Sequence, residues 1–266
     1  MLQLFELNKI LIYVINMVHE MIYDSFDNND VIDRVKIERG MLVRREIDAA
    51  VLKWIAIISM LIDHFAIAIY WQLDIHVYEI YKLQRYIGRI AFPIYCFLLV
   101  EGFFYTKNVK KYITRCFVFA FISEIPFDMA IYGTVFSQES QNVYFTLTLG
   151  LCTLYVLEQF KGYGIKNVLG QAMSVGLFAY LAQILEVDYH WKGIIFIVMF
   201  YYCRNMEKRI RNIIGICFFA YEITAPLAFI PIHLYNGKRG KQNKYLFYIL
   251  YPLHLLIYGL IRMLVL

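Results

Sequence analysis

The sequence is short of charged residues. Only 18% of its 266 residues are Asp, Glu, Lys or Arg, whereas a soluble globular domain carries about 25%. Hydrophobic residues make up 61% of the chain and gather in long runs. This composition excludes an ordinary soluble domain and indicates a helical protein that crosses a membrane several times.

The motifs of soluble catalytic domains are also missing. The chain contains no glycine-rich phosphate loop, no H-E-x-x-H motif and no serine nucleophile elbow. Its five cysteines stand singly inside apolar runs, without C-x-x-C spacing. We therefore interpret them as small buried apolar residues and expect no metal. Any chemistry must take place inside the membrane bundle.

Long apolar runs separated by polar loops are present instead. We expect an all-α transmembrane bundle of about nine spans over residues 49–266, with kinked or re-entrant segments. The loop at 72–85 is expected to be polar, and the second span to cover 86–105. Around residues 210–236, Pro226 and Pro231 interrupt the apolar pattern. We interpret this region as two short segments rather than one kinked span.

Loop charges predict the orientation. The net charge is +5, and the basic residues sit in short loops, which fits membrane orientation better than nucleic-acid binding. The positive-inside rule then places the N-terminus in the cytoplasm and the chain in the inner (cytoplasmic) membrane, in contact with lipid. Residues 1–48 are interpreted separately, as an amphipathic interfacial helix followed by a charged connector.

Ionisable side chains lie inside the apolar runs, where they are costly unless they face the bundle interior or a cavity. Asp63 and His64 are adjacent in the first run, and ten residues separate Lys53 from His64. On a helix this spacing puts His64 about 16 Å deeper. A neutral histidine can accept a proton from an amine or a hydroxyl, and a carboxylate can orient its ring. Asp63 has Arg89 as an alternative partner.

More polar groups follow in later runs. Arg89 either forms a structural ion pair with Asp63 or Asp128 or belongs to the functional site, and the two roles are compatible. A proline kink in the third run lets Glu124 and Asp128, four residues apart, both face inward. Asn142 opens the fourth run, either as part of the polar site or as a helix cap.

The remaining candidates lie near the predicted cytoplasmic side and in the last run. His254 is a second histidine inside a run and points to a polar cavity shared with His64. Glu101 is either a snorkelling residue or part of a cofactor entrance. A glycine-flanked basic turn suits cofactor phosphates, lipid headgroups or a plain positive anchor; it contains Asn236, Lys238 and Arg239. The loop residue Asp188 is expected to be solvated.

Residue chemistry alone leaves different functions open. Buried histidines, carboxylates and an arginine fit proton transfer in catalysis, and they equally fit a proton-coupled transporter or exporter. The amphipathic N-terminal helix also allows a non-catalytic assembly partner.

Several motifs, in order over about residues 51–254, resemble the TraX family: LKWIAIISMLIDHFAIAIY, YIGRIAFPIYCFLLVEGFFYTKNVKKY, ISEIPFD, QNVYFTLTLGL, LYNGKRG and YPLH. That family is named for a conjugation-associated protein that acetylates pilin. It is similar to membrane acyltransferases in which a basic residue, ten residues and a histidine occur in the first span. The resemblance implies acetyl transfer from acetyl-CoA to a peptide, glycan or small-molecule acceptor; the pilin substrate does not carry over.

The resemblance also implies roles for the polar residues. His64 would be the catalytic base, and Lys53 would lie near the CoA end. The residues implied around the base are Asp63, Glu124, Asp128 and Arg89. Those expected at the cofactor are Lys53, Glu101, Asn236, Lys238 and Arg239. Asn142 and His254 are expected along the substrate tunnel. Direct transfer and an acyl-enzyme both stay open.

Overall fold

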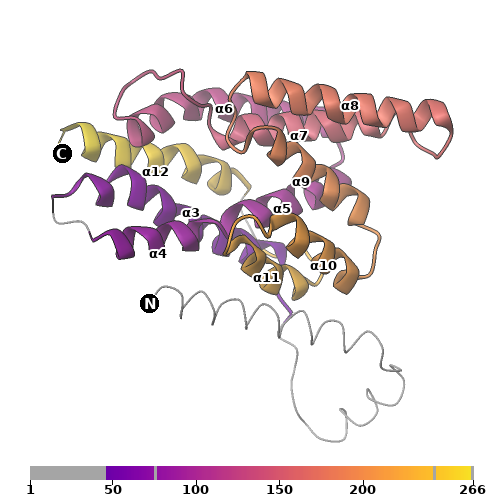
Figure 1. Ribbon diagram of the computed structural model, residues 1–266, viewed down its shortest axis with the longest axis horizontal. Helices are drawn as coiled ribbons and strands as arrows, with labels where there is room; N and C mark the ends of the chain where they lie inside the picture. Colours follow the sequence, from indigo (N-terminus) through magenta and orange to yellow (C-terminus); the bar gives the residue numbers. More distant parts are fainter. Residues whose placement is uncertain (1–45, 75–76, 242–243, 265–266) are drawn as a thin grey trace, which may run out of the picture.

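The computed structural model describes residues 46–74, 77–241 and 244–264. Over these residues the named elements are all helical, which confirms the predicted all-α bundle (Figure 1). The predicted interfacial helix and most of the charged connector, residues 1–45, lie outside the described residues.

The helices follow one another with short connections. The first part comprises α3 (Ala49–Ala68), the 3-10 turn η1 (Tyr70–Gln72), α4 (Tyr78–Gly88) and α5 (Ala91–Tyr105). The middle comprises α6 (Val109–Ile131), α7 (Val143–Leu157), α8 (Ile165–Ile184) and α9 (His190–Cys203). The last part comprises α10 (Lys208–Phe219), η2 (Ala225–Ala228), α11 (Phe229–His233) and α12 (Lys244–Leu264).

Helix α5 lies at the centre of the bundle (Figure 1) and contacts α3, α7 and α9. Most of its side chains are buried, because the helix is apolar on all sides. Helix α8 packs along α7 and α9 and exposes large apolar side chains such as Met173 and Leu177. An exposed apolar face of this kind suits contact with lipid.

Three of the described helical stretches are long and apolar enough to cross a membrane: Ala49–Gln72, Tyr78–Tyr105 and Tyr245–Leu264. Val143–Leu157 is apolar but shorter. The predicted number of about nine crossings stays a prediction.

The predicted polar loop at 72–85 was partly wrong, because α4 begins at Tyr78. This helix is amphipathic, so its charged residues hid its periodicity in the sequence. A side chain at Gly88 would overlap Asp63; glycine therefore lets the end of α4 approach α3 closely. The predicted second span, 86–105, is divided between α4 and α5.

The region around 210–236 folds as two short segments, as predicted. Helix α10 leads to a turn in which the Thr224 hydroxyl donates to the Tyr86 carbonyl (2.6 Å). Then η2 and α11 return the chain to the start of α3, where the Asn236 N–H donates to the Ile47 carbonyl (3.0 Å). The basic turn after residue 236 therefore lies beside the first residues of α3.

A cap at the N-terminus of α3 stabilises that junction. The Asp48 carboxylate accepts hydrogen bonds from the N–H groups of Ala50 (2.9 Å) and Val51 (3.0 Å), which satisfies the first turn of α3. Gly240 has a φ of +69° and lies against Asp48 with no room for a side chain. Glycine is required there both for its backbone conformation and for the close contact.

Candidate functional site

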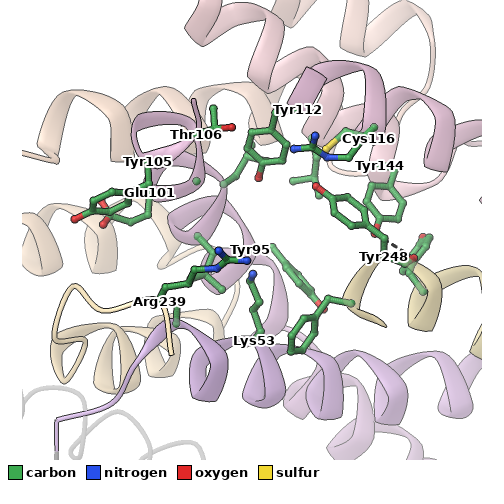
Figure 2. A pocket seen from close by; sticks show the side chains of 18 of the residues that line it. Lys53, Tyr95, Glu101, Tyr105, Thr106, Tyr112, Cys116, Tyr144, Arg239 and Tyr248 are labelled. Carbon is green, nitrogen blue, oxygen red and sulfur yellow. Dashed lines mark hydrogen bonds between the residues drawn. The ribbon is translucent and has the colours of Figure 1, made fainter. Parts of the chain in front are cut away.

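A cavity of about 790 Å³ opens between α3, α5, α6, α7 and α12 (Figure 2). On α3 its lining follows one face of the helix: Ala49, Lys53, Ile57 and Met60. On α12 its lining residues are Phe247, Tyr248 and Tyr251. The cavity thus begins beside the basic turn at 236–240 and runs along both helices into the bundle.

Basic side chains gather at the mouth of the cavity. Figure 2 shows the Lys53 ammonium and the Arg239 guanidinium close together, and their charges interact. Lys107 and Arg115 also line the cavity. Neighbouring cations repel one another, and an anion bound between them relieves that repulsion. The mouth therefore suits a phosphate-bearing ligand.

Glu101 lines the same end of the cavity, but its charge is balanced. Its carboxylate accepts a hydrogen bond from the Arg204 guanidinium at 3.0 Å. The Arg204 guanidinium also stacks over the Phe104 ring, 4.3 Å from its centre. Glu101 therefore fixes Arg204 at the edge of the mouth rather than repelling an anion there.

The histidine pair lies just beyond the last lining residues. His64 follows Met60 by one helical turn on the same face of α3, and His254 follows Tyr251 on α12. Their rings are parallel within 2°, and His64 Nδ1 is 2.7 Å from His254 Nε2. The structure thus brings the two predicted histidines into direct contact from opposite ends of the sequence.

Hydrogen bonding determines which ring nitrogens carry protons. His254 Nδ1 is 2.8 Å from the Leu250 carbonyl oxygen, which can only accept, so this nitrogen is the donor. In a neutral pair, His254 Nε2 must then accept the proton on His64 Nδ1. This leaves the lone pair of His64 on Nε2, which is the form required of a general base.

The carboxylates expected to orient His64 are bound elsewhere. Asp63 accepts a hydrogen bond from Arg85 at 2.6 Å, and Arg89 pairs with Glu222 at 3.3 Å. The predicted pairing of Arg89 with Asp63 or Asp128 is therefore wrong as a direct contact. Arg85 replaces it because the last turn of α4 lies against α3 at Gly88 and brings the Arg85 side chain to Asp63. His254 is the hydrogen-bonded partner of His64.

Glu124, Asp128 and Asn142 lie at the junction of α6 and α7. Asn142 caps α7 by accepting from the Tyr144 N–H (3.0 Å), and its amide donates to the Ala120 carbonyl (2.8 Å) and to Glu124. Asp128 accepts from the Ser137 N–H (2.9 Å). These contacts show that Asn142 caps a helix, which was one of the two predicted roles. They also place Glu124, Asp128 and Asn142 in one junction.

Residues of the basic turn have two different roles, lining the cavity and forming the turn itself. Arg239 lines the cavity. Asn236 accepts a hydrogen bond from the Lys238 N–H (2.9 Å), and the Lys238 carbonyl accepts from the Ala49 N–H (2.9 Å). Lys238 itself is exposed. Asn236 and the Lys238 backbone thus shape the turn that presents Arg239.

Asp188 is not solvated as expected. It is half-buried, and burial raises the pKa of its carboxyl to about 6, with the nearby Asp63 charge adding to the effect. Left-handed backbones occur at Glu186 and Tyr189 of its loop and at His190, the first residue of α9. The loop also hydrogen-bonds to Gln141 through the Asp188 N–H (2.9 Å). No local pattern in the sequence indicates this long-range packing.

Sequence reasoning also missed the tyrosines that line the cavity. They are Tyr95, Tyr105, Tyr112, Tyr144, Tyr235, Tyr248 and Tyr251. The chain contains 23 tyrosines, and most tyrosines of a membrane protein serve its interfaces and its packing. Their number therefore hid the few that face the cavity.

A helical bundle with apolar spans, a cationic cavity and a buried histidine pair defines a membrane protein with a polar site inside the bundle. Residues 48–262 match the family described as TraX protein. The chain belongs to the TraX family, as its motifs predicted.

Two relatives give the range of similarity. The "Probable fimbrial assembly protein FimC, serogroup H1" of Dichelobacter nodosus is 29% identical over 237 residues, covering 77% of this chain and 91% of the relative. The "Uncharacterized protein RP591" of Rickettsia prowazekii (strain Madrid E) is 31% identical over 106 residues, covering 39% of this chain and 35% of the relative. No solved structure matches the chain.

Proposed function

We propose that the protein is a multi-pass acetyltransferase of the inner membrane. It would move an acetyl group from cytoplasmic acetyl-CoA to an amine or hydroxyl of a membrane-associated or exported acceptor. One observation carries the proposal: the cavity leads from clustered cations along α3 and α12 to Met60 and Tyr251, one helical turn before the histidine pair. Such a path joins an anion-binding mouth to a general base.

The donor would enter with its phosphates at the mouth. Lys53 and Arg239 line this end from α3 and the basic turn, and Lys107 and Arg115 line the cavity from the α5–α6 side. Charge-assisted hydrogen bonds to phosphate oxygens are among the stronger polar contacts. The thioester would extend past the aromatic lining towards Met60. Family membership and the basic loops beside the mouth support entry from the cytoplasm.

His64 would act as the base on the acceptor. Its Nε2 carries the lone pair because Nδ1 donates to His254, which donates in turn to Leu250. A positioned base contributes about 10²–10⁴-fold to a rate. His254 then acts as a positioning residue and not as part of the tunnel wall. The fimbrial relative makes the amino group of an exported pilin-like peptide one acceptor worth testing.

The test uses the full chain purified in detergent, with ¹⁴C-acetyl-CoA as donor and n-octylamine as acceptor. We expect His64→Ala to abolish transfer, because the base is lost. His254→Leu should lower kcat by about 10²-fold, near the lower end of acid–base contributions. His254→Gln should recover part of this loss, because its amide oxygen can accept from His64. His190→Asn, at the half-exposed start of α9, is the matched control and should match wild type.

Full activity of His64→Ala with a normal thermal midpoint would refute this mechanism. Equal effects of His254→Leu and His254→Gln on kcat would remove the positioning role from His254. Measuring acetyl-CoA binding to each variant separates lost chemistry from lost binding.

A proton-coupled exporter is the second candidate. A network of buried charges favours it: Asp63 pairs with Arg85, Arg89 pairs with Glu222, and Asp188 lies near Asp63 and Arg89. Such groups occur along the proton pathways of transporters. Calorimetry with acetyl-CoA separates the two functions. Binding supports the transferase, whereas no binding together with proton-driven export from vesicles supports the transporter.

A further inference from the structure

Two phenol groups lie at the inner end of the cavity. Tyr95 comes from α5 and Tyr251 from α12, and both line the cavity. The Tyr95 hydroxyl donates to the Met60 sulfur at 3.8 Å, and a thioether is a weak acceptor. Among the described residues this is the one hydrogen bond of that hydroxyl, so it can turn to a stronger acceptor in the cavity.

Tyr251 is the phenol next to the proposed base. Its ring meets the His64 ring edge to face, with 6.0 Å between the centres. Its oxygen is hydrogen-bonded to the backbone of Val143, the first residue of α7. The free backbone donor at that position is an N–H group, because the first N–H groups of a helix have no partner within it. The phenol oxygen therefore accepts, and its own proton remains to be donated.

The start of α7 strengthens this donor. Amide groups at a helix N-terminus carry partial positive charge. A hydroxyl that accepts from such an amide becomes a better donor to a third group, because hydrogen bonds in a chain polarise one another. Asn142 holds this end of α7 against α6. The Tyr251 hydroxyl is thus a polarised donor that α12 carries and that the start of α7 holds by a hydrogen bond.

We propose that Tyr251 and Tyr95 form the oxyanion site for acetyl transfer, binding the carbonyl oxygen of the acetyl thioester. This inference rests on the proposed function. Tyr251 packs against the His64 ring, and the Tyr95 hydroxyl contacts Met60, one helical turn before His64. A thioester that enters from the mouth therefore meets the two phenols as it reaches the base. Glu101, the carboxylate among the described lining residues, belongs to the mouth and is paired with Arg204.

The bonds made and broken balance in this arrangement. The acceptor nitrogen forms a bond to the carbonyl carbon while His64 Nε2 takes a proton from that nitrogen. The electron pair of the C=O bond moves to oxygen, where the two hydroxyls donate. When the C=O bond re-forms, the C–S bond breaks and its electron pair leaves with sulfur. The proton on His64 then passes to the thiolate, giving free CoA and restoring the base.

The test replaces one hydroxyl at a time. Tyr251→Phe and Tyr95→Phe keep the rings and remove the donors. Tyr202→Phe is the matched control, because its hydroxyl donates to Gln171 on α8 (2.6 Å), outside the cavity lining. The measurement is ¹⁴C-acetyl transfer from acetyl-CoA to n-octylamine and to water, since attack by either acceptor passes through the same oxyanion.

We expect Tyr251→Phe to lower kcat by about 10²–10³-fold, as loss of one oxyanion donor does. Tyr95→Phe should lower kcat less, and the KM for acetyl-CoA should stay within about threefold of wild type in both. Unchanged kcat in both variants, or a loss confined to KM, overturns the inference while wild type remains active. A wild-type protein that transfers no acetyl group overturns the proposed function itself.

Discussion

At the scale of single residues, proton positions follow from one backbone carbonyl. The Leu250 oxygen can only accept, so it determines the tautomer of His254 and, through it, that of His64. Serine hydrolases use a carboxylate to hold a histidine in the same way. Here a second histidine takes the place of the carboxylate.

Asp188 provides a prediction about pH. Burial raises the pKa of its carboxyl from 3.8 to about 6, so the folded protein holds this proton more tightly than the unfolded chain. Stability from this group is therefore complete below pH 3.8 and is lost as pH rises through about 6. At neutral pH the charged carboxylate costs about 3 kcal/mol.

Asp188→Asn removes that cost without removing much volume. We expect it to raise the thermal midpoint in detergent at pH 7.5, and the gain to shrink as the pH approaches 4. Glu139→Gln, on an exposed loop residue, is the control and should show no such trend. A gain that does not vary with pH would contradict the assigned cause.

At the scale of elements, the α6–α7 junction shows how a helix can begin inside a bundle. The first turn of α7 would leave unpaired N–H groups away from water. The Asn142 side chain accepts from the Tyr144 N–H, and the Tyr251 oxygen satisfies Val143. Capping therefore fixes the place where α7 meets the cavity.

Asn142→Ala should destabilise the protein by about 1–3 kcal/mol, because it removes a cap and leaves Glu124 without its partner. Asn142→Asp keeps a capping oxygen but places it beside the Glu124 carboxylate. It should therefore recover stability at low pH only. Thermal unfolding in detergent at two pH values measures both effects. Wild-type stability of the alanine variant would show that the junction is held by other contacts.

At the scale of the whole molecule, the basic turn and the start of α3 form one end of the bundle. Backbone hydrogen bonds join residues 47–49 to residues 234–238. The loop at 133–141 comes one helix length away, after α6. The proposed orientation therefore puts the cavity mouth in the cytoplasm and that loop outside.

Cysteine labelling tests this orientation. In a Cys217→Ser background, because Cys217 is exposed, Lys238→Cys should react with an impermeant maleimide only in inverted vesicles. Glu139→Cys should react in intact cells. Both positions are exposed, so each provides the control for the other. Labelling of the two cysteines from the same side would rule out the proposed topology.

Local sequence patterns were enough to predict the class of the protein and most of its helices. Apolar runs are a local property, so α3, α6, α9 and α12 could be predicted from composition and spacing. The family, and the choice of His64 as a candidate catalytic residue, also followed from local motifs. Helix α4 was the exception, because its charged residues led to the prediction of a polar loop there.

Which polar groups contact one another could not be predicted without the packing of the helices. His64 and His254 are 190 positions apart, and neither residue indicates in sequence that the other completes its hydrogen bonding. Arg85 rather than Arg89 reaches Asp63, since that choice depends on how closely α4 approaches α3 at Gly88. Partner choice depends on the packing of whole helices, whereas helix formation depends on neighbours along the chain.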